Sequence, residues 1–157
     1  MSWKKQVQKF LPLLGHRNWI LVTDKAYPLQ SAEGIRTVYT GESSLAVLQY
    51  VITSIKKEKH TRPILYTDQE LSYMGDDLSR GIEAFKKDLL TLTSGREMRS
   101  IPHEEIFATL DAASKSFNIL VLKTDTCLPY TSVFIELDCG YWSAEHEKLL
   151  RERISKA

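Results

Sequence analysis

The sequence predicts an α/β domain with a mainly parallel central sheet, and three observations support this fold class. Short apolar runs typical of strands alternate along the chain with stretches of helical periodicity. Two of the runs, residues 19–23 and 117–123, are almost continuously apolar, as expected of strands that helices cover on both faces. No repeat, low-complexity tract or linker interrupts the pattern. We therefore expect residues 1–157 to form a single domain.

Apolar periodicity and chain breakers define the elements of the amino-terminal half. Apolar residues recur at three- and four-residue steps from Trp3, and Pro12 ends the helix that they predict at about residue 11. Ser43 or Ser44 caps a second amphipathic helix, which runs to about Lys56. The strands expected in this half cover residues 19–23, 35–39 and 62–68.

The same signals continue in the carboxyl-terminal half. In chain order we expect an irregular or short helical segment at 70–79, a helix at 82–92, an edge strand at 99–101 and a helix at 102–116. Two strands at 117–123 and 130–137 follow, and then a C-terminal helix from about 143. Pro102 suits the first turn of its helix, and Ser143 is the cap of the last one.

Composition and charge exclude several classes of protein. The 157 residues are 43% hydrophobic and 26% charged, as in soluble globular domains. The net charge is +1 without a basic block, so nucleic acid is not an expected partner. The apolar runs are too short to cross a membrane, and the amino terminus lacks the apolar region of a signal peptide. Cys127 and Cys139 are expected to be reduced and buried, and the protein to be cytoplasmic.

The common catalytic motifs are absent. The sequence contains no G-x-G-x-x-G, no G-x-x-x-x-G-K-[ST], no G-x-S-x-G and no H-E-x-x-H. His103-Glu104-Glu105 lacks the second histidine that a zinc-binding helix would need. We therefore expect neither a cofactor nor a metal, and acid–base chemistry by histidine and aspartate remains.

Four side chains at the ends of predicted elements are candidates for this chemistry. His16 precedes strand 19–23, and an imidazole exchanges protons near neutral pH. Asp24 follows the same strand at its carboxyl end, where ligands of α/β sheets bind. His103 lies at a helix start, where the dipole favours a proton-accepting imidazole. Tyr130 opens a strand and offers a phenol for hydrogen bonding or stacking.

Three of these candidates also have a purely structural interpretation. A histidine beside a glycine, as at Gly15-His16, is often a surface or capping residue. Asp24 before a loop can simply form a turn, and His103 in Pro-His-Glu-Glu can be an ordinary first-turn residue. The spacing alone therefore predicts an α/β domain that could be an acid–base enzyme.

Three short motifs, in the right order, resemble the RbsD/FucU family of ribose pyranases and fucose mutarotases. The first is Leu14-Gly15-His16 followed by an apolar strand, Asp24 and Pro28. The second is His103-Glu104, similar to the His-Glu of the ribose-type branch. The third is the segment 129–132, similar to the family's Tyr-x-Asn segment, with Ser132 in place of the asparagine. The resemblance covers nearly the whole chain and implies an RbsD-like three-layer α/β/α fold.

The resemblance also implies an activity and roles for five residues. It implies a cofactor-independent isomerase that interconverts ring forms or anomers of a free monosaccharide such as ribose or fucose. His16 matches the family's general acid. Asp24, His103 and Tyr130 match its sugar-contacting residues, and Ser132 occupies a further substrate-binding position. The family forms ring-shaped homo-oligomers, pentamers or decamers, with sites between neighbouring subunits.

The distance along the first strand agrees with a site that two chains share. His16 and Asp24 are eight residues apart, which corresponds to about 26 Å in an extended chain. A monosaccharide is smaller than this, so either the loops fold back or a second subunit completes the site. Two other functions remain open, namely a sugar-binding or sensing protein without turnover and a scaffold that uses only the ring.

Overall fold

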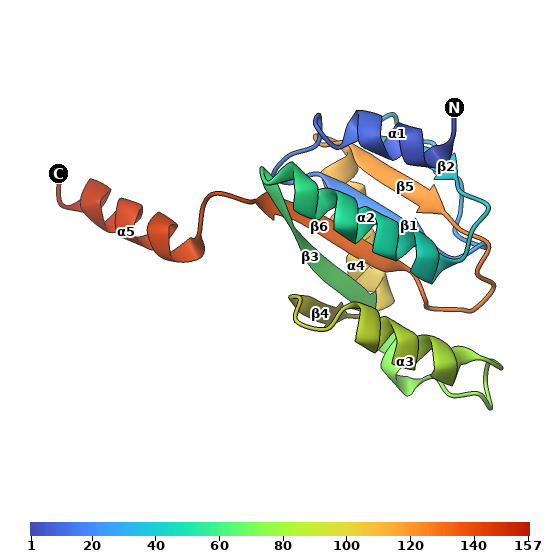
Figure 1. The fold of residues 1–157 in the computed structure, drawn as a ribbon. Coiled ribbons are helices and arrows are strands. Elements are labelled where there is room, and N and C mark those ends of the chain that lie inside the picture. Colours follow the sequence, from blue (N-terminus) through green and yellow to red (C-terminus); the bar gives the residue numbers. More distant parts are fainter.

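A computed structural model describes residues 1–157, and its helices and strands follow the expected order. The elements are α1 (Trp3–Phe10), β1 (Trp19–Thr23), β2 (Ile35–Tyr39), α2 (Ser44–Glu58), β3 (Thr61–Asp68), the 3₁₀ helix η1 (Gln69–Tyr73), α3 (Ile82–Leu92), β4 (Met98–Ile101), α4 (His103–Ser114), β5 (Ile119–Lys123), β6 (Val133–Cys139) and α5 (Ala144–Ser155). Figure 1 shows how they are arranged around one central sheet.

The sheet has six strands in the order β2-β5-β1-β6-β3-β4. Three pairings are parallel, β2 with β5, β5 with β1 and β3 with β4, and β6 runs antiparallel to both of its neighbours. The segment 124–132 between β5 and β6 is too short for the crossover that a parallel connection requires, so β6 must reverse direction. The expected mainly parallel sheet is confirmed, with one antiparallel strand near its centre.

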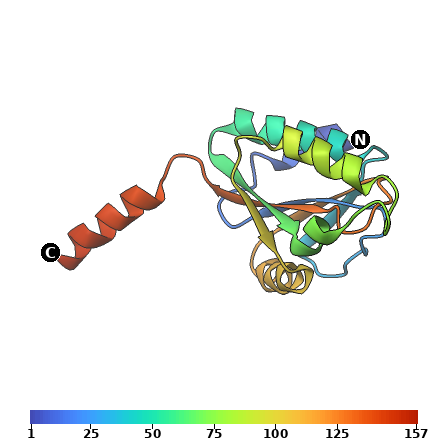
Figure 2. The same cartoon turned by 90° about the horizontal axis from the view of Figure 1, so that it is seen from below.

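Helices cover both faces of the sheet and give the expected three layers. α1, α2 and α3 pack on one face, and α4 packs alone on the other, as Figure 2 shows. Side chains alternate along β1, so that Ile20 and Val22 face the three helices whereas Trp19 and Leu21 face α4. All five residues of β1 are buried, as the continuous apolar run predicted.

Some element boundaries and the burial of the cysteines differ from the expectations, and the strand expected at 117–123 begins at Ile119. The last strand begins at Val133 rather than at residue 130, because Tyr130 has a φ of 58° and forms part of a turn. The α4 helix ends at Ser114, two residues earlier than expected. Cys127 is exposed and Cys139 is half-buried, so the expectation that both cysteines are buried is wrong, and both are free thiols.

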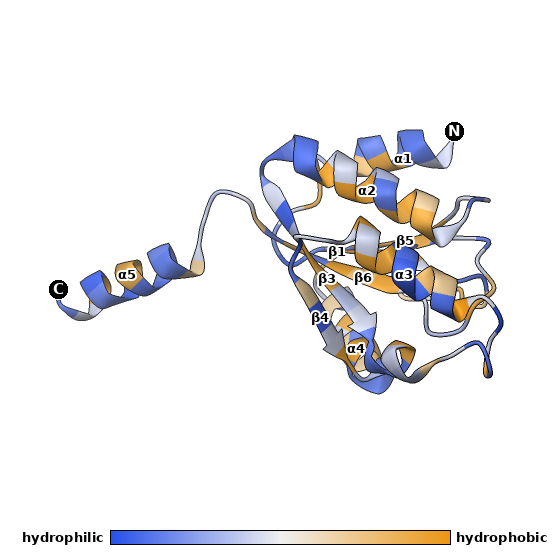
Figure 3. Ribbon diagram, turned by 60° about the horizontal axis from the view of Figure 1, so that its bottom comes forward, coloured by the Kyte–Doolittle hydropathy of each residue, from blue (hydrophilic) through white to orange (hydrophobic).

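The C-terminal helix α5 extends away from the rest of the chain (Figures 1 and 3). Its Ser143 cap accepts a hydrogen bond from the backbone N–H of His146, as the sequence predicted. None of its residues is buried, and Figure 3 shows it mostly in the hydrophilic colour. No helix in the chain is both long and apolar enough to cross a membrane.

Candidate functional site

Four of the five predicted site residues lie together at one edge of the sheet, and His16 does not. Asp24, His103, Tyr130 and Ser132 line a pocket of about 300 Å³. This volume is at the lower end of the range for small-molecule sites. His16 precedes β1 and therefore lies at the opposite end of this strand from Asp24. Within one chain, the predicted general acid and the predicted sugar ligands occupy separate places.

The sheet topology explains why residues about a hundred positions apart meet in this pocket. Asp24 follows β1, and the carboxyl end of β1 lies beside the amino end of the antiparallel strand β6, where Ser132 lies. β3 pairs with the other side of β6 and ends at Asp68. His103 begins α4, directly after β4, whose carboxyl end lies beside that of β3. Carboxyl ends of parallel strands are the usual ligand sites of α/β sheets.

Ser132 holds Asp24 in place on the floor of the pocket. The Ser132 hydroxyl accepts a hydrogen bond from the Asp24 backbone N–H at 3.2 Å and donates one to Asp24 Oδ1 at 3.1 Å. Ser132 is buried, whereas Asp24 is only half-buried. The structure thus gives Ser132 a partner inside the protein, and Asp24 Oδ2 remains for a ligand.

Asp68 is a site residue that the sequence analysis missed. It is 1% exposed, lines the same pocket, and its Oδ1 lies 2.9 Å from Nδ1 of His103. The backbone N–H of His103 donates to the Glu70 carboxylate at 3.0 Å, which caps the start of α4. An aspartate at the end of a largely apolar strand, in Tyr66-Thr67-Asp68, was the available signal. Without a known partner, an aspartate at the end of a strand does not by itself indicate a functional site.

Aromatic rings form one wall of the pocket. The His103 ring lies 4.7 Å from Phe107 and 5.5 Å from Tyr130, which meets it edge-on, and Phe107 stacks on Tyr27 at 5.6 Å. The Tyr27 hydroxyl is buried without a hydrogen-bond partner. The left-handed backbone of Tyr130 places its ring at this wall with 39% of the residue exposed. Aromatic faces opposite carboxylates suit a ligand with both apolar C–H and hydroxyl groups.

Burial shifts the proton affinities of two groups in the pocket. Burial raises the pKa of Asp68, and the nearby Glu70 and Asp24 carboxylates raise it further, although the contact with His103 opposes this shift. Burial also raises the pKa of the Tyr27 phenol well above its usual range, with added repulsion from Asp68 and Asp24. Groups with raised pKa values that share a pocket are typical of sites that handle protons.

The raised pKa of Asp68 predicts that this residue destabilises the fold increasingly as pH rises. The folded chain holds the Asp68 proton more tightly than the unfolded chain, whose aspartates ionise near pH ~4. Stability is therefore lost as pH rises from the unfolded value through the raised folded value, and it stays lower above it. Asp68→Asn carries a neutral isostere at this position. As pH rises from acidic to alkaline values, we expect its free energy of unfolding to increase relative to that of wild type.

Urea unfolding of both proteins across that pH range measures this difference. Subtracting the two curves removes the contribution of the carboxylates that lie far from Asp68, which titrate alike in both proteins. Asp111→Asn is the matched control, because it makes the same exchange at an exposed carboxylate of α4 that is in no ion pair. A constant difference between Asp68→Asn and wild type at all pH values would contradict the raised pKa of Asp68.

His16 has a different set of neighbours. Its Nδ1 lies 3.2 Å from Oδ1 of Asp138, and Nη2 of Arg62 donates to Oδ2 of Asp138 at 2.6 Å. Trp142 lies in the same hollow, which measures about 600 Å³. The His16 side chain is 57% exposed, so it is presented at the surface. No residue of the Asp24 pocket lines this hollow.

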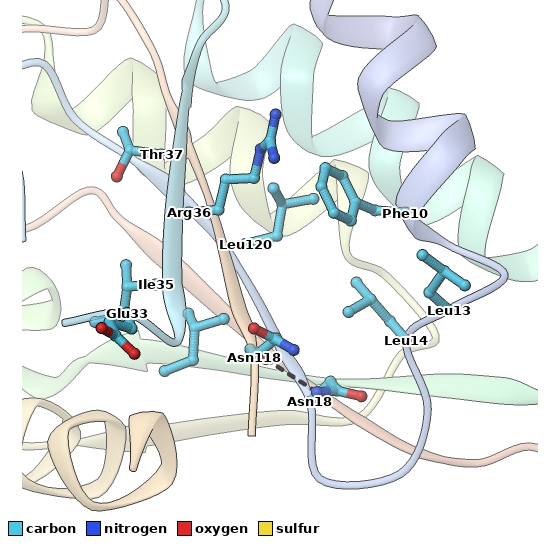
Figure 4. A pocket seen from close by; sticks show the side chains of 11 residues that line it. Phe10, Leu13, Leu14, Asn18, Glu33, Ile35, Arg36, Thr37, Asn118 and Leu120 are labelled. Carbon is cyan, nitrogen blue, oxygen red and sulfur yellow. Dashed lines mark hydrogen bonds between the residues drawn. The ribbon is translucent and has the colours of Figure 1, made fainter. Parts of the chain in front are cut away.

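Another hollow, of about 570 Å³, lies between α1, the edge strand β2 and its neighbour β5 (Figure 4). Its walls are the aliphatic or aromatic side chains of residues such as Phe10 and Leu14, and its only charged residues are Glu33 and Arg36. The amide of Asn18 donates to the backbone carbonyl of Asn118 at 3.0 Å, and both residues line the hollow. It contains no histidine, so we do not assign it acid–base chemistry.

The pocket lined by Asp24 and His103 has the groups needed for proton transfer and hydroxyl binding. An imidazole, two carboxylates, two phenols and one hydroxyl converge on it from His103, Asp24, Asp68, Tyr27, Tyr130 and Ser132. No lysine or arginine lines it. No group of three or more His, Cys, Asp or Glu side chains in the chain is placed to hold a metal ion.

Comparison with known proteins identifies the fold. No protein-family model and no curated protein matches the chain. RbsD from Bacillus subtilis, complexed with D-ribose, matches with a TM-score of 0.61 and 17% identity over 88% of this chain and 93% of that chain. FucU from Bifidobacterium longum matches with a TM-score of 0.54 and 12% identity, over 84% and 92%. Atu2016, described as a sugar binding protein, matches with a TM-score of 0.54 and 18% identity, over 83% and 87%. The chain therefore has the RbsD-like α/β/α fold.

Proposed function

We propose that this protein is a cofactor-independent isomerase that interconverts the ring forms or anomers of a free, ribose- or fucose-like monosaccharide. The observation that carries the proposal is the convergence of Asp24, Asp68, His103 and Tyr130 on one pocket at the carboxyl ends of β1 and β3. The shared fold with RbsD, whose structure holds D-ribose, supports a sugar as the ligand. The match in fold does not depend on these side chains, so the two arguments are independent.

Ring opening needs only two proton transfers, and ring closure needs the same two in reverse. A base removes the proton of the anomeric hydroxyl, the C1–O1 bond becomes a carbonyl, and the bond between C1 and the ring oxygen breaks. An acid delivers a proton to that ring oxygen, which leaves as a hydroxyl group. Closure on the other face, or by another hydroxyl, reverses these steps and gives the other anomer or ring size. One well-placed acid or base contributes about 10²–10⁴-fold to such a step.

The pocket provides groups for one side of this reaction. His103 is the group for the anomeric proton, and Asp24, oriented by Ser132, binds sugar hydroxyls. The Tyr130 ring packs against the sugar and fixes its pose. The acid for the ring oxygen is His16, delivered by a neighbouring copy, since its own chain holds it at the far end of β1.

This arrangement requires an assembly, which we propose to be a ring of identical subunits. His16 is exposed at the surface and anchored by Asp138, as a residue offered to a neighbour would be. A ring places the donor face of each chain against the receptor face of the next, and it closes with every site filled. The partners required are therefore the monosaccharide and further copies of the 18.0 kDa chain.

Anomer exchange across a panel of free monosaccharides tests the proposed activity. We expect the wild-type protein to accelerate exchange for at least one pentose or deoxyhexose in saturation-transfer NMR. His103→Ala is expected to lower the rate by about 10²–10⁴-fold, because the anomeric hydroxyl loses its base. His146→Ala is the control, because His146 lies on the isolated helix α5 and should keep the wild-type rate.

A sugar-binding or sensing protein is the second candidate. The mutual hydrogen bonds of Asp24 and Ser132 favour it, because they leave fewer free groups for polarising a sugar than two open side chains would. Thermal stabilisation by a sugar without faster exchange would select this function over the isomerase. Neither stabilisation nor exchange with any sugar of the panel would contradict both.

A further inference from the structure

The buried carboxylate of Asp68 lies directly behind His103, and no motif in the sequence assigns it a role. The Asp68 side chain is 0% exposed, and the His103 side chain is 33% exposed. Nδ1 of His103 lies 2.9 Å from Oδ1 of Asp68, within ion-pair distance, and both atoms are buried without a hydrogen bond of standard geometry. A buried carboxylate with a single partner is costly for the fold, so its presence needs an explanation.

The contact determines which nitrogen of His103 is available to a ligand. Nδ1 is buried against Asp68, whereas Nε2 is neither buried nor bonded within the chain. Because a carboxylate only accepts, it holds the proton of a neutral imidazole on Nδ1. The lone pair of Nε2 is then directed to the exposed side of the ring, in the pocket shared with Asp24 and Tyr130.

We propose that Asp68 is the positioning residue that fixes the tautomer of His103 and makes its Nε2 the base of this pocket. This inference rests on the proposed sugar chemistry and adds a residue to it. In the step, Nε2 takes the proton of the anomeric hydroxyl as the C1–O1 carbonyl forms and the bond between C1 and the ring oxygen breaks. His103 becomes an imidazolium, which Asp68 stabilises, and the proton returns on ring closure.

The neighbouring carboxylates do not compete for this role. Glu70 binds the backbone N–H of His103 rather than its ring, at 3.0 and 3.3 Å. Asp24 is engaged by Ser132. Tyr27 lies near Asp68 but makes no hydrogen bond to it. Asp68 is thus the group that contacts the His103 ring nitrogen.

The tautomer can be measured without turnover. Magic-angle-spinning ¹⁵N NMR of protein labelled at its four histidines reports both ring nitrogens, with His103 assigned by difference from His103→Gln. At a pH about two units above the ordinary histidine pKa, we expect wild-type His103 to carry its proton on Nδ1. Asp68→Asn should shift it to Nε2 or to a mixture, because the asparagine amide can donate to Nδ1.

Asp111→Asn, the same exchange at an exposed position of α4, is the matched control and should keep the wild-type tautomer. A purely structural role for Asp68 predicts that Asp68→Asn unfolds at lower denaturant and leaves the His103 signals of the folded protein unchanged. An unchanged Nδ1–H tautomer in Asp68→Asn, or an Nε2–H tautomer in wild type, would overturn the proposal. The tautomer of His103 can be measured even when no sugar in the panel is turned over. A failure of this inference can therefore be distinguished from a failure of the proposed activity.

Kinetics give a second readout where a sugar is turned over. We expect Asp68→Asn to lower kcat by roughly 10²-fold, within the range of one acid–base group, with little change in KM. Asp111→Asn, on the exposed side of α4, should retain both values. A loss confined to KM in Asp68→Asn would show that Asp68 only shapes the binding site, and it would overturn the proposed positioning of the base.

Discussion

Replacing His16 by alanine is expected to lower anomer exchange by about 10²–10⁴-fold, the contribution of one general acid. The substitution should leave the fold intact, because the His16 side chain is 57% exposed. The residue lies outside the pocket formed by Asp24 and His103 in its own chain. A large loss of activity would therefore require His16 to act in the pocket of a neighbouring copy.

Mixing two inactive variants tests this arrangement directly. His16→Ala and His103→Ala, co-expressed with different tags and purified through both, form mixed rings. If each site takes His16 from one chain and His103 from the next, roughly a quarter of the sites in a random mixture contain both histidines. We expect exchange to recover to about that fraction of the wild-type rate, although each variant alone is inactive.

Two results would contradict a shared site. The mixture would stay as inactive as its components if both histidines served a site within one chain. A wild-type rate in His16→Ala would show that His16 is not the acid. His60→Ala is an unsuitable control, because the His60 ring contacts the backbone carbonyl of Leu14, near His16. His146→Ala on α5 serves instead.

Replacing Phe134 by alanine is expected to cost about 3–5 kcal/mol of unfolding free energy. Phe134 is fully buried in β6 and packs with Trp19, Leu21, Ile106 and Leu110 in the core that joins the sheet to α4. α4 is the only helix on this face, so little else can move in to fill the cavity. This loss is a large fraction of the free energy of unfolding of a typical domain.

Chemical unfolding measured by circular dichroism gives this difference. Tyr73→Ala is the matched control, since it also removes an aromatic ring but from a residue that is 79% exposed. It should change the unfolding free energy by no more than ~0.5 kcal/mol. A cost for Phe134→Ala as small as that of the control would contradict the packing of α4 against β6.

Most of the fold was accessible from the sequence, because local patterns set most of its elements. The apolar run at 19–23 predicted a strand buried on both faces, and β1 is such a strand, with neighbours on both sides. The Ser43 and Ser143 caps start α2 and α5 as expected. The start of β6 was misplaced, because the left-handed turn at Tyr130 follows from tertiary contacts and has no glycine to mark it.

The candidate site could be predicted only in part. Polar residues at the ends of predicted elements suggested His16, Asp24, His103 and Tyr130, and the family resemblance added Ser132. Asp68 was not found, because a carboxylate at the end of a strand carries no local sign of what lies beside it. Its contact with His103 spans 35 residues and depends on β3 and β4 lying side by side.

By itself, the sequence determined the order of helices and strands, the two-sided burial of the sheet and the chemical types available for catalysis. These properties depend on the spacing and polarity of residues that lie within a few positions of one another along the chain. Only the tertiary structure decided that β6 inserts antiparallel between β1 and β3, and this insertion brings Ser132 beside Asp24. It also decided that β1 holds His16 and Asp24 apart, because a strand is rigid and extended and keeps its two ends at opposite edges of the sheet.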